Sequence, residues 1–166
     1  MSQQRATLHF LIATWFGAGR SPKAPGTVGS LAALPFAWLL VATVGAMGLL
    51  IAAALVFAIG VWASAHHART LGSGDPGEIV VDEVVGQWIA VLALPLDPLA
   101  YAVAFVTFRV FDIAKPWPIR LADEKLKGGF GIMADDVLAG LAALAVSTGL
   151  WFYFGAWSPF TSHGTF

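Results

Sequence analysis

The chain has 166 residues, of which 58% are hydrophobic and only 11% are charged. Soluble domains carry about 25% charged residues, so this composition predicts an integral membrane protein, and the length suits one domain over residues 1–166. A net charge of −1 leaves no basic excess for a nucleic-acid partner, and the absence of cysteine excludes disulfides and cysteine-bound metals.

The first apolar stretches predict helices near the N-terminus. Residues 1–16 hold one arginine and an apolar run too short for a signal peptide, which predicts an interfacial or re-entrant helix. Residues 31–65 carry no charge and exceed a single span of about 20 residues. Glycines near the middle of this stretch therefore predict two helices, 31–44 and 47–66, with Pro35 in the opening turn of the first.

A second hairpin and a final span are predicted further along the chain. The hairpin consists of residues 84–94, a "PLDP" turn and residues 99–111, and the last apolar helix covers 137–154. The chain is thus expected to be all-α and polytopic, with short transmembrane hairpins plus a final span. Each predicted helix of the hairpin is short for a full crossing, so we expect tilt or shelter by neighbouring helices.

Polar segments separate these hairpins and predict the topology. Because the segments 15–30, 67–83 and 109–136 are joined by hairpins, all three motif loops are expected on one membrane face. All nine lysines and arginines belong to that face if residues 1–16 do not cross. The positive-inside rule then places this face in the cytoplasm.

The first polar segment, "GAGRSPKAPGTVGS" at 17–30, combines glycines with cations and hydroxyls. Arg20, Lys23 and Thr27 in this pattern suggest a phosphate-binding loop at a helix N-terminus. A tight turn whose cations meet anionic lipid headgroups explains the same residues. The spacing does not match a Walker loop.

Paired carboxylates adjoin two apolar segments, as Asp82–Glu83 and as Asp135–Asp136. One such pair is explained by helix capping and the helix dipole. Two pairs in matching places suggest a cation between them, because clustered carboxylates repel each other. Mg²⁺ is the expected ion, since it prefers oxygen ligands and bridges to phosphate.

The third polar segment contains Arg109, Asp112 and Lys115 at intervals of three. If residues 105–115 are helical, these side chains line one stripe, either as a simple ion-pair ladder or as part of a site. His66 and His67 end the second predicted helix, where we expect headgroup contact rather than catalysis.

Four segments, "GAGRSPKAPGTVGSL", "DPGEIVVDEVVG", "FRVFDIAKPWPI" and "GGFGIMADDVLAG", resemble the signature blocks of the bacterial phosphatidylglycerophosphatase A family, in the family's order. The resemblance covers about residues 15–140. It implies a Mg²⁺-dependent phosphatase of the bacterial inner membrane whose active site faces the cytoplasm. The implied reaction converts phosphatidylglycerophosphate to phosphatidylglycerol and phosphate, with membrane lipid as the surrounding partner.

Together, the motifs and the resemblance assign expected roles. The expected metal ligands are Asp82, Glu83, Asp135 and Asp136. The expected phosphate-binding residues are Arg20, Lys23, Thr27, Arg109 and Lys115. The expected catalytic residues are Glu83, Asp112 and Asp136, with Asp112 either a further ligand or the base that orients water.

Two other functions suit a membrane protein with clustered acids, a cation-coupled transporter and a non-enzymatic lipid-binding module. A transporter is expected to carry acids in the middle of its spans. Here the acids adjoin the predicted ends of the spans on one face, which favours chemistry on a lipid headgroup. The sequence predicts neither the oligomeric state nor the number of metal ions.

Overall fold

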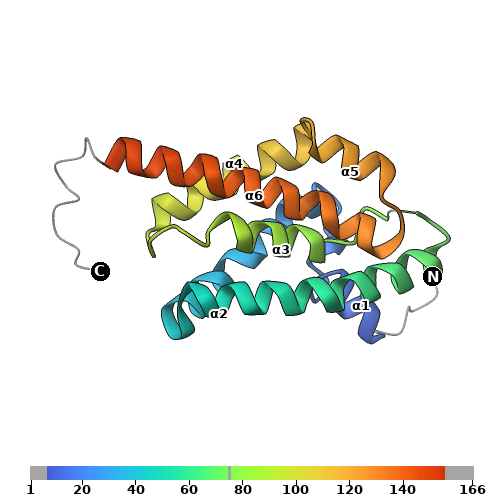
Figure 1. The fold of residues 1–166 in the computed structure, drawn as a ribbon. Coiled ribbons are helices and arrows are strands. Elements are labelled where there is room, and N and C mark those ends of the chain that lie inside the picture. The colour runs from blue at the N-terminus through green and yellow to red at the C-terminus, as the bar shows by residue number, and fades with distance from the viewer. Residues whose placement is uncertain (1–6, 75, 156–166) are drawn as a thin grey trace.

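The computed structural model describes residues 7–74 and 76–155, and every regular element in these ranges is helical, as predicted. Arg5, Asp75 and the residues beyond 155 lie outside the described residues. Figure 1 shows the arrangement of the helices. In chain order they are α1 (Leu8–Ala13), the short 3₁₀ helix η1 (Ala18–Arg20), α2 (Pro25–Leu71), α3 (Val81–Ala90), α4 (Pro98–Ala114), α5 (Ile119–Lys125) and α6 (Gly128–Gly155).

Helix α2 doubles back near its middle (Figure 1), which confirms the predicted break. Gly45 has φ 74° and ψ 178°, a conformation that glycine adopts without steric cost. Both arms are longer than predicted, since α2 begins at Pro25 and ends where Gly72 forms a left-handed cap. Pro35 consequently lies in the interior of the first arm, and its prediction as an opening-turn residue was wrong.

Helices α3 and α4 form the predicted second hairpin with shifted bounds. Asp97 caps α4, accepting hydrogen bonds from the backbone N–H groups of Leu99 at 2.8 Å and Ala100 at 3.0 Å. The 10 residues of α3 span only about 15 Å, half of a hydrocarbon core of about 30 Å. Nearly all of α3 is buried, and it packs between α2 and α6, so neighbouring helices shelter it.

Helix α6 begins at Gly128, nine residues before the predicted start at Val137. The glycines there are packing positions rather than a loop. A Cβ atom on Gly129 would lie 2.9 Å from the Cβ atom of Ala65, and one on Gly131 would lie 2.6 Å from the carbonyl oxygen of Leu126. Asp135 and Asp136 therefore lie inside α6, in its second and third turns, rather than at its N-terminus.

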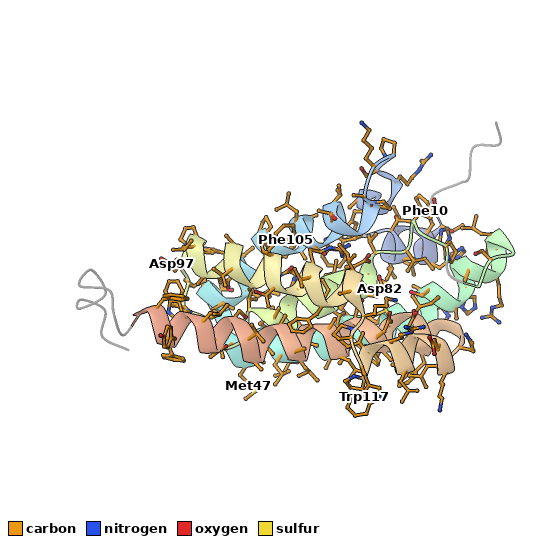
Figure 2. All side chains as sticks on the ribbon, turned by 90° about the horizontal axis from the view of Figure 1, so that it is seen from above. Phe10, Met47, Asp82, Asp97, Phe105 and Trp117 are labelled. Carbon is orange, nitrogen blue, oxygen red and sulfur yellow. The ribbon has the colours of Figure 1, made fainter. Side chains whose placement is uncertain are left out.

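Two helices, α2 and α6, are long and apolar enough to cross a membrane. Their outer faces carry exposed large side chains, such as Leu39 at 61% and Met47 at 67%. Figure 2 shows Met47 and Asp97 near one end of the helix bundle, whereas Phe10 and Asp82 lie towards the other. Met47, close to the helix break at Gly45, and Asp97, the cap of α4, thus lie away from Asp82.

Candidate active site

The first signature segment packs against the start of α3. Val80 N–H donates to the carbonyl oxygen of Ala13 at 2.8 Å. A Cβ atom on Gly29 would lie 2.7 Å from the Cβ of Val80, and one on Gly19 would overlap the carbonyl oxygen of Glu78. These glycines let α2 and the preceding turn press directly on the backbone that carries Asp82.

A close crossing of α3 and α6 brings two acidic segments together. A Cβ atom on Gly140 would lie 2.5 Å from the carbonyl oxygen of Gly86, and one on Gly86 would lie 2.7 Å from that of Asp136. No other residue type fits at these two positions without moving the helices apart. The crossing places the first turn of α3 beside Asp136.

Three of the four predicted metal ligands converge at this crossing. Ligand oxygens of Asp82, Glu83 and Asp136 all lie within 4.8 Å of one another. Asp136 is 3% exposed. Glu83 Oε2 and Asp136 Oδ2 are buried and have no hydrogen-bond partner among the described residues. Buried, unpaired carboxylate oxygens are costly without a cation, so this donor set fits a hard ion such as Mg²⁺.

Asp135, the fourth predicted ligand, contacts a cation of the protein instead. Lys115 Nζ donates to Asp135 Oδ2 and to Asp123 Oδ1, each at 2.6 Å. Lys115 follows α4 with a φ of 41°, so it does not continue the predicted helical stripe. Burial opposes its charge, but the two carboxylates outweigh burial and raise the pKa of Lys115 above the ordinary 10.5.

Arg109 lies behind the carboxylate cluster. Its Nη1 atom is 2.6 Å from Asp112 Oδ2, 3.8 Å from Glu83 Oε1 and 3.3 Å from the Ser30 hydroxyl oxygen. The predicted i,i+3 contact between Arg109 and Asp112 is therefore present. Gly26 makes room for Glu83 beside Arg109, because a Cβ atom there would overlap the Glu83 carboxylate and lie 3.2 Å from Arg109 Nη1.

Electrostatics at the start of α3 also favour a bound cation. Asp82 and Glu83 are adjacent in its first turn, and a carboxylate oxygen of Asp136 lies within 4.8 Å of one from each of them. Among the described residues, Arg109 supplies the guanidinium that contacts this cluster, and Glu83 and Asp112 share it. A divalent ion would supply the missing positive charge and keep these acids ionised.

The cluster opens into a cavity of about 790 Å³. Asp82, Glu83, Asp112, Asp135, Asp136 and Lys115 line it, as do Asp123, Arg69 and Lys127, which the sequence reasoning did not single out. Arg69 belongs to the last turn of α2, and Lys127 directly precedes α6. The sequence signal that could have identified Arg69 and Lys127 was their place in the predicted polar segments 67–83 and 109–136.

The predicted phosphate-binding residues of the first segment lie elsewhere. Arg20 is exposed, with its guanidinium 6.0 Å from the centre of the Phe10 ring. Lys23 is exposed and Thr27 is half-buried, and none of the three lines the cavity. The structure thus brings Lys115 to the cavity, but not these three residues.

A buried histidine supports one cavity wall. His67 is 1% exposed, and its Nε2 atom is 2.6 Å from Glu78 Oε1. This pair ties the end of α2 to the loop before α3. His66, its neighbour, is exposed.

Known proteins are similar to this chain over the residues that form the site. The family model for phosphatidylglycerophosphatase A matches residues 11–151. The chain belongs to the phosphatidylglycerophosphatase A family. It is accordingly a lipid phosphatase, and this sets aside the transporter and the non-enzymatic lipid-binding module.

Relatives of this family share most of the chain. A phosphatidylglycerophosphatase A from Escherichia coli is 42% identical over 87% of this chain and 82% of its own. One from Haemophilus influenzae is 45% identical over 82% of this chain and 84% of its own. A relative from Bacteroides thetaiotaomicron, 44% identical over 81% of this chain and 87% of its own, is provisionally named a phosphatidylinositol-3-phosphatase. No solved structure is significantly similar to the chain.

Proposed function

We propose that this phosphatase hydrolyses phosphatidylglycerophosphate to phosphatidylglycerol and inorganic phosphate, with Mg²⁺ as its cofactor. The observation that carries the proposal is the convergence of Asp82, Glu83 and Asp136 within 4.8 Å, with two buried carboxylate oxygens left unpaired. Bound Mg²⁺ would polarise the phosphomonoester and neutralise its charge. Two relatives are named phosphatidylglycerophosphatase A, after this substrate.

The surrounding residues have complementary roles in this proposal. Asp112 lines the cavity and holds the attacking water, accepting a proton from it as the water oxygen bonds to phosphorus. The bond from phosphorus to the glycerol oxygen breaks, and that oxygen takes up a proton from solvent to give phosphatidylglycerol. Lys115 is the cavity cation nearest to Asp135, and it stabilises charge on the phosphate oxygens. Arg109 keeps Asp112 and Glu83 in position from behind.

We also propose that the enzyme is a multi-pass protein of the bacterial inner membrane. The two arms of α2, the path through α3 and its following loop, α4 and α6 give five passes. In this arrangement the cavity faces the cytoplasm, together with the described basic residues, and α6 is the final span. The apolar outer faces of α2 and α6 support this placement.

A phosphate-release assay tests the proposed function. Detergent-solubilised enzyme is incubated with phosphatidylglycerophosphate, first with excess chelator and then with excess Mg²⁺. We expect release to stop with chelator and to return with Mg²⁺. Full turnover in excess chelator would contradict the role of the metal, and absence of release under both conditions would contradict the substrate.

A further inference from the structure

Acidic and basic side chains both line the cavity. Asp82, Glu83 and Asp136 converge within it. Arg69 and Lys127 also line it, from the end of α2 and the start of α6. Neither cation takes part in the proposed metal site.

The packing of α2 on α6 explains why these two cations line the same cavity. A Cβ atom on Gly129 would lie 3.0 Å from the backbone nitrogen of Ala65, so the start of α6 touches α2 at that residue. Lys127 lies two residues before this contact. Arg69 lies one turn after it, and its Nε donates to the Ala65 carbonyl oxygen at 2.9 Å. The Arg69 side chain is thus held at the end of α2, on which the start of α6 packs, and Lys127 lines the same cavity.

Arg69 and Lys127 differ from Lys115 in that they can bind an anion without giving up an acidic partner. Lys115, the third cavity cation, is held by two carboxylates at 2.6 Å each. Among the described residues, no carboxylate lies within 4.0 Å of the side-chain nitrogens of Arg69 or Lys127. An anionic ligand in the cavity would therefore find them without displacing an acid.

The substrate of the proposed function carries two anionic groups. One is the terminal phosphomonoester, which is cleaved, and the other is the phosphodiester that joins glycerol to the lipid. In the proposed function the carboxylate cluster and its cation bind the cleaved phosphate, which leaves the phosphodiester without an assigned site. We propose that Arg69 and Lys127 form a subsite for the bridging phosphodiester, and this inference rests on the proposed function. Arginine and lysine suit this role, because charge-assisted hydrogen bonds to phosphate are strong and arginine binds it bidentately.

The two products of the reaction separate the two subsites experimentally. Phosphatidylglycerol keeps only the phosphodiester, whereas inorganic phosphate corresponds to the cleaved group. Inhibition by each product is measured in neutral detergent micelles, which removes attraction to anionic lipid, for wild type, Arg69→Ala and Lys127→Ala. We expect each substitution to raise the inhibition constant of phosphatidylglycerol and the KM for substrate about tenfold or more. The inhibition constant of inorganic phosphate should stay unchanged.

Lys125→Ala and Arg120→Ala are matched controls, because both residues are exposed on α5 and neither lines the cavity. They should behave as wild type. A raised constant for inorganic phosphate with an unchanged constant for phosphatidylglycerol would overturn the assignment, since the cations would then bind the cleaved group. Unchanged constants for both products would overturn it as well. Failure of wild type to release phosphate would instead refute the proposed function.

Discussion

The crossing of α3 and α6 offers a test in which one methyl group moves the metal ligands. In Gly140→Ala the new Cβ atom would lie 2.5 Å from the Gly86 carbonyl oxygen, whereas ordinary contacts begin at 3.4 Å. The helices must therefore separate by about 0.9 Å, taking Asp82 and Glu83 away from Asp136. A misplacement of about 1 Å at a reacting centre lowers rates about 100-fold.

The protein should survive this change. Overpacking costs about 1–3 kcal/mol, and replacing a helical glycine by alanine recovers up to about 1 kcal/mol. We therefore expect folded Gly140→Ala protein with a slightly lower Tm and roughly 100-fold slower phosphate release at saturating Mg²⁺. Tm is followed by thermal unfolding in detergent, and turnover is measured on phosphatidylglycerophosphate.

Gly149→Ala is the matched control on the same helix. A Cβ atom there has no atom within 4 Å, so this variant should keep wild-type turnover and gain up to about 1 kcal/mol of stability. Wild-type turnover in Gly140→Ala would refute the reasoning, because the close crossing would then not set the geometry of the site. Equal loss in both variants would refute it too.

Three further predictions concern charge, capping and topology. Because the pKa of Lys115 is raised, its ion pairs contribute fully below the ordinary pKa of 10.5 and are lost only as the pH rises through the raised value. The Tm difference between wild type and Lys115→Met should therefore stay constant between about pH 7 and about pH 9, and a steep fall would contradict the pairing. Asp97→Ala should cost about 1 kcal/mol in unfolding experiments and Asp97→Asn much less, with turnover unchanged in both; equal stability of the two variants would exclude a capping role. Topology reporters fused after Arg69 and Lys125 should report the cytoplasm and one after Phe166 the opposite side, and a Phe166 reporter on the same side would exclude five passes.

The paired acids predict that the start of α3 lies close to α6, but they do not predict which residue each acid contacts. The prediction gives both acids of a pair the same role. Neighbouring side chains on a helix point about 100° apart, so Asp135 and Asp136 face different surroundings. One reaches Lys115, and the other reaches the cluster. The packing of distant segments decides which acid contacts Lys115 and which joins the carboxylate cluster. The local sequence pattern does not contain this information.

Glycines misled the prediction of helix bounds for a related reason. The segment before Asp135 contains three closely spaced glycines, and the predicted last helix begins only at residue 137. In the structure Gly129 and Gly131 are helical, because α6 lies too close to Ala65 and Leu126 for a side chain. By contrast, Gly45 does break its helix, because its φ is positive. A Cβ atom there would have no atom within 4 Å, so Gly45 is not a packing position. Sequence alone does not separate these two uses of glycine.

Arg20 and Lys23 were predicted to bind phosphate because of the composition of their segment, and the structure does not bring them to the cavity. Cations among glycines suggested a phosphate loop, yet the glycines of that segment serve to pack it against the start of α3. The cavity cations come from helix ends instead, where sequence offered only single basic residues. Convergence of such isolated residues depends on the contact of α2 with α6.

The central claim, that Asp82, Glu83 and Asp136 hold Mg²⁺, is tested most directly by equilibrium Mg²⁺ binding to detergent-solubilised protein by titration calorimetry. Even residues that only support metal ligands change affinity about 10- to 100-fold, so Asp82→Asn and Asp136→Asn should weaken binding at least that much. Both variants should remain folded, and Asp97→Asn should bind as wild type does. Wild-type affinity in both Asp82→Asn and Asp136→Asn would contradict the account.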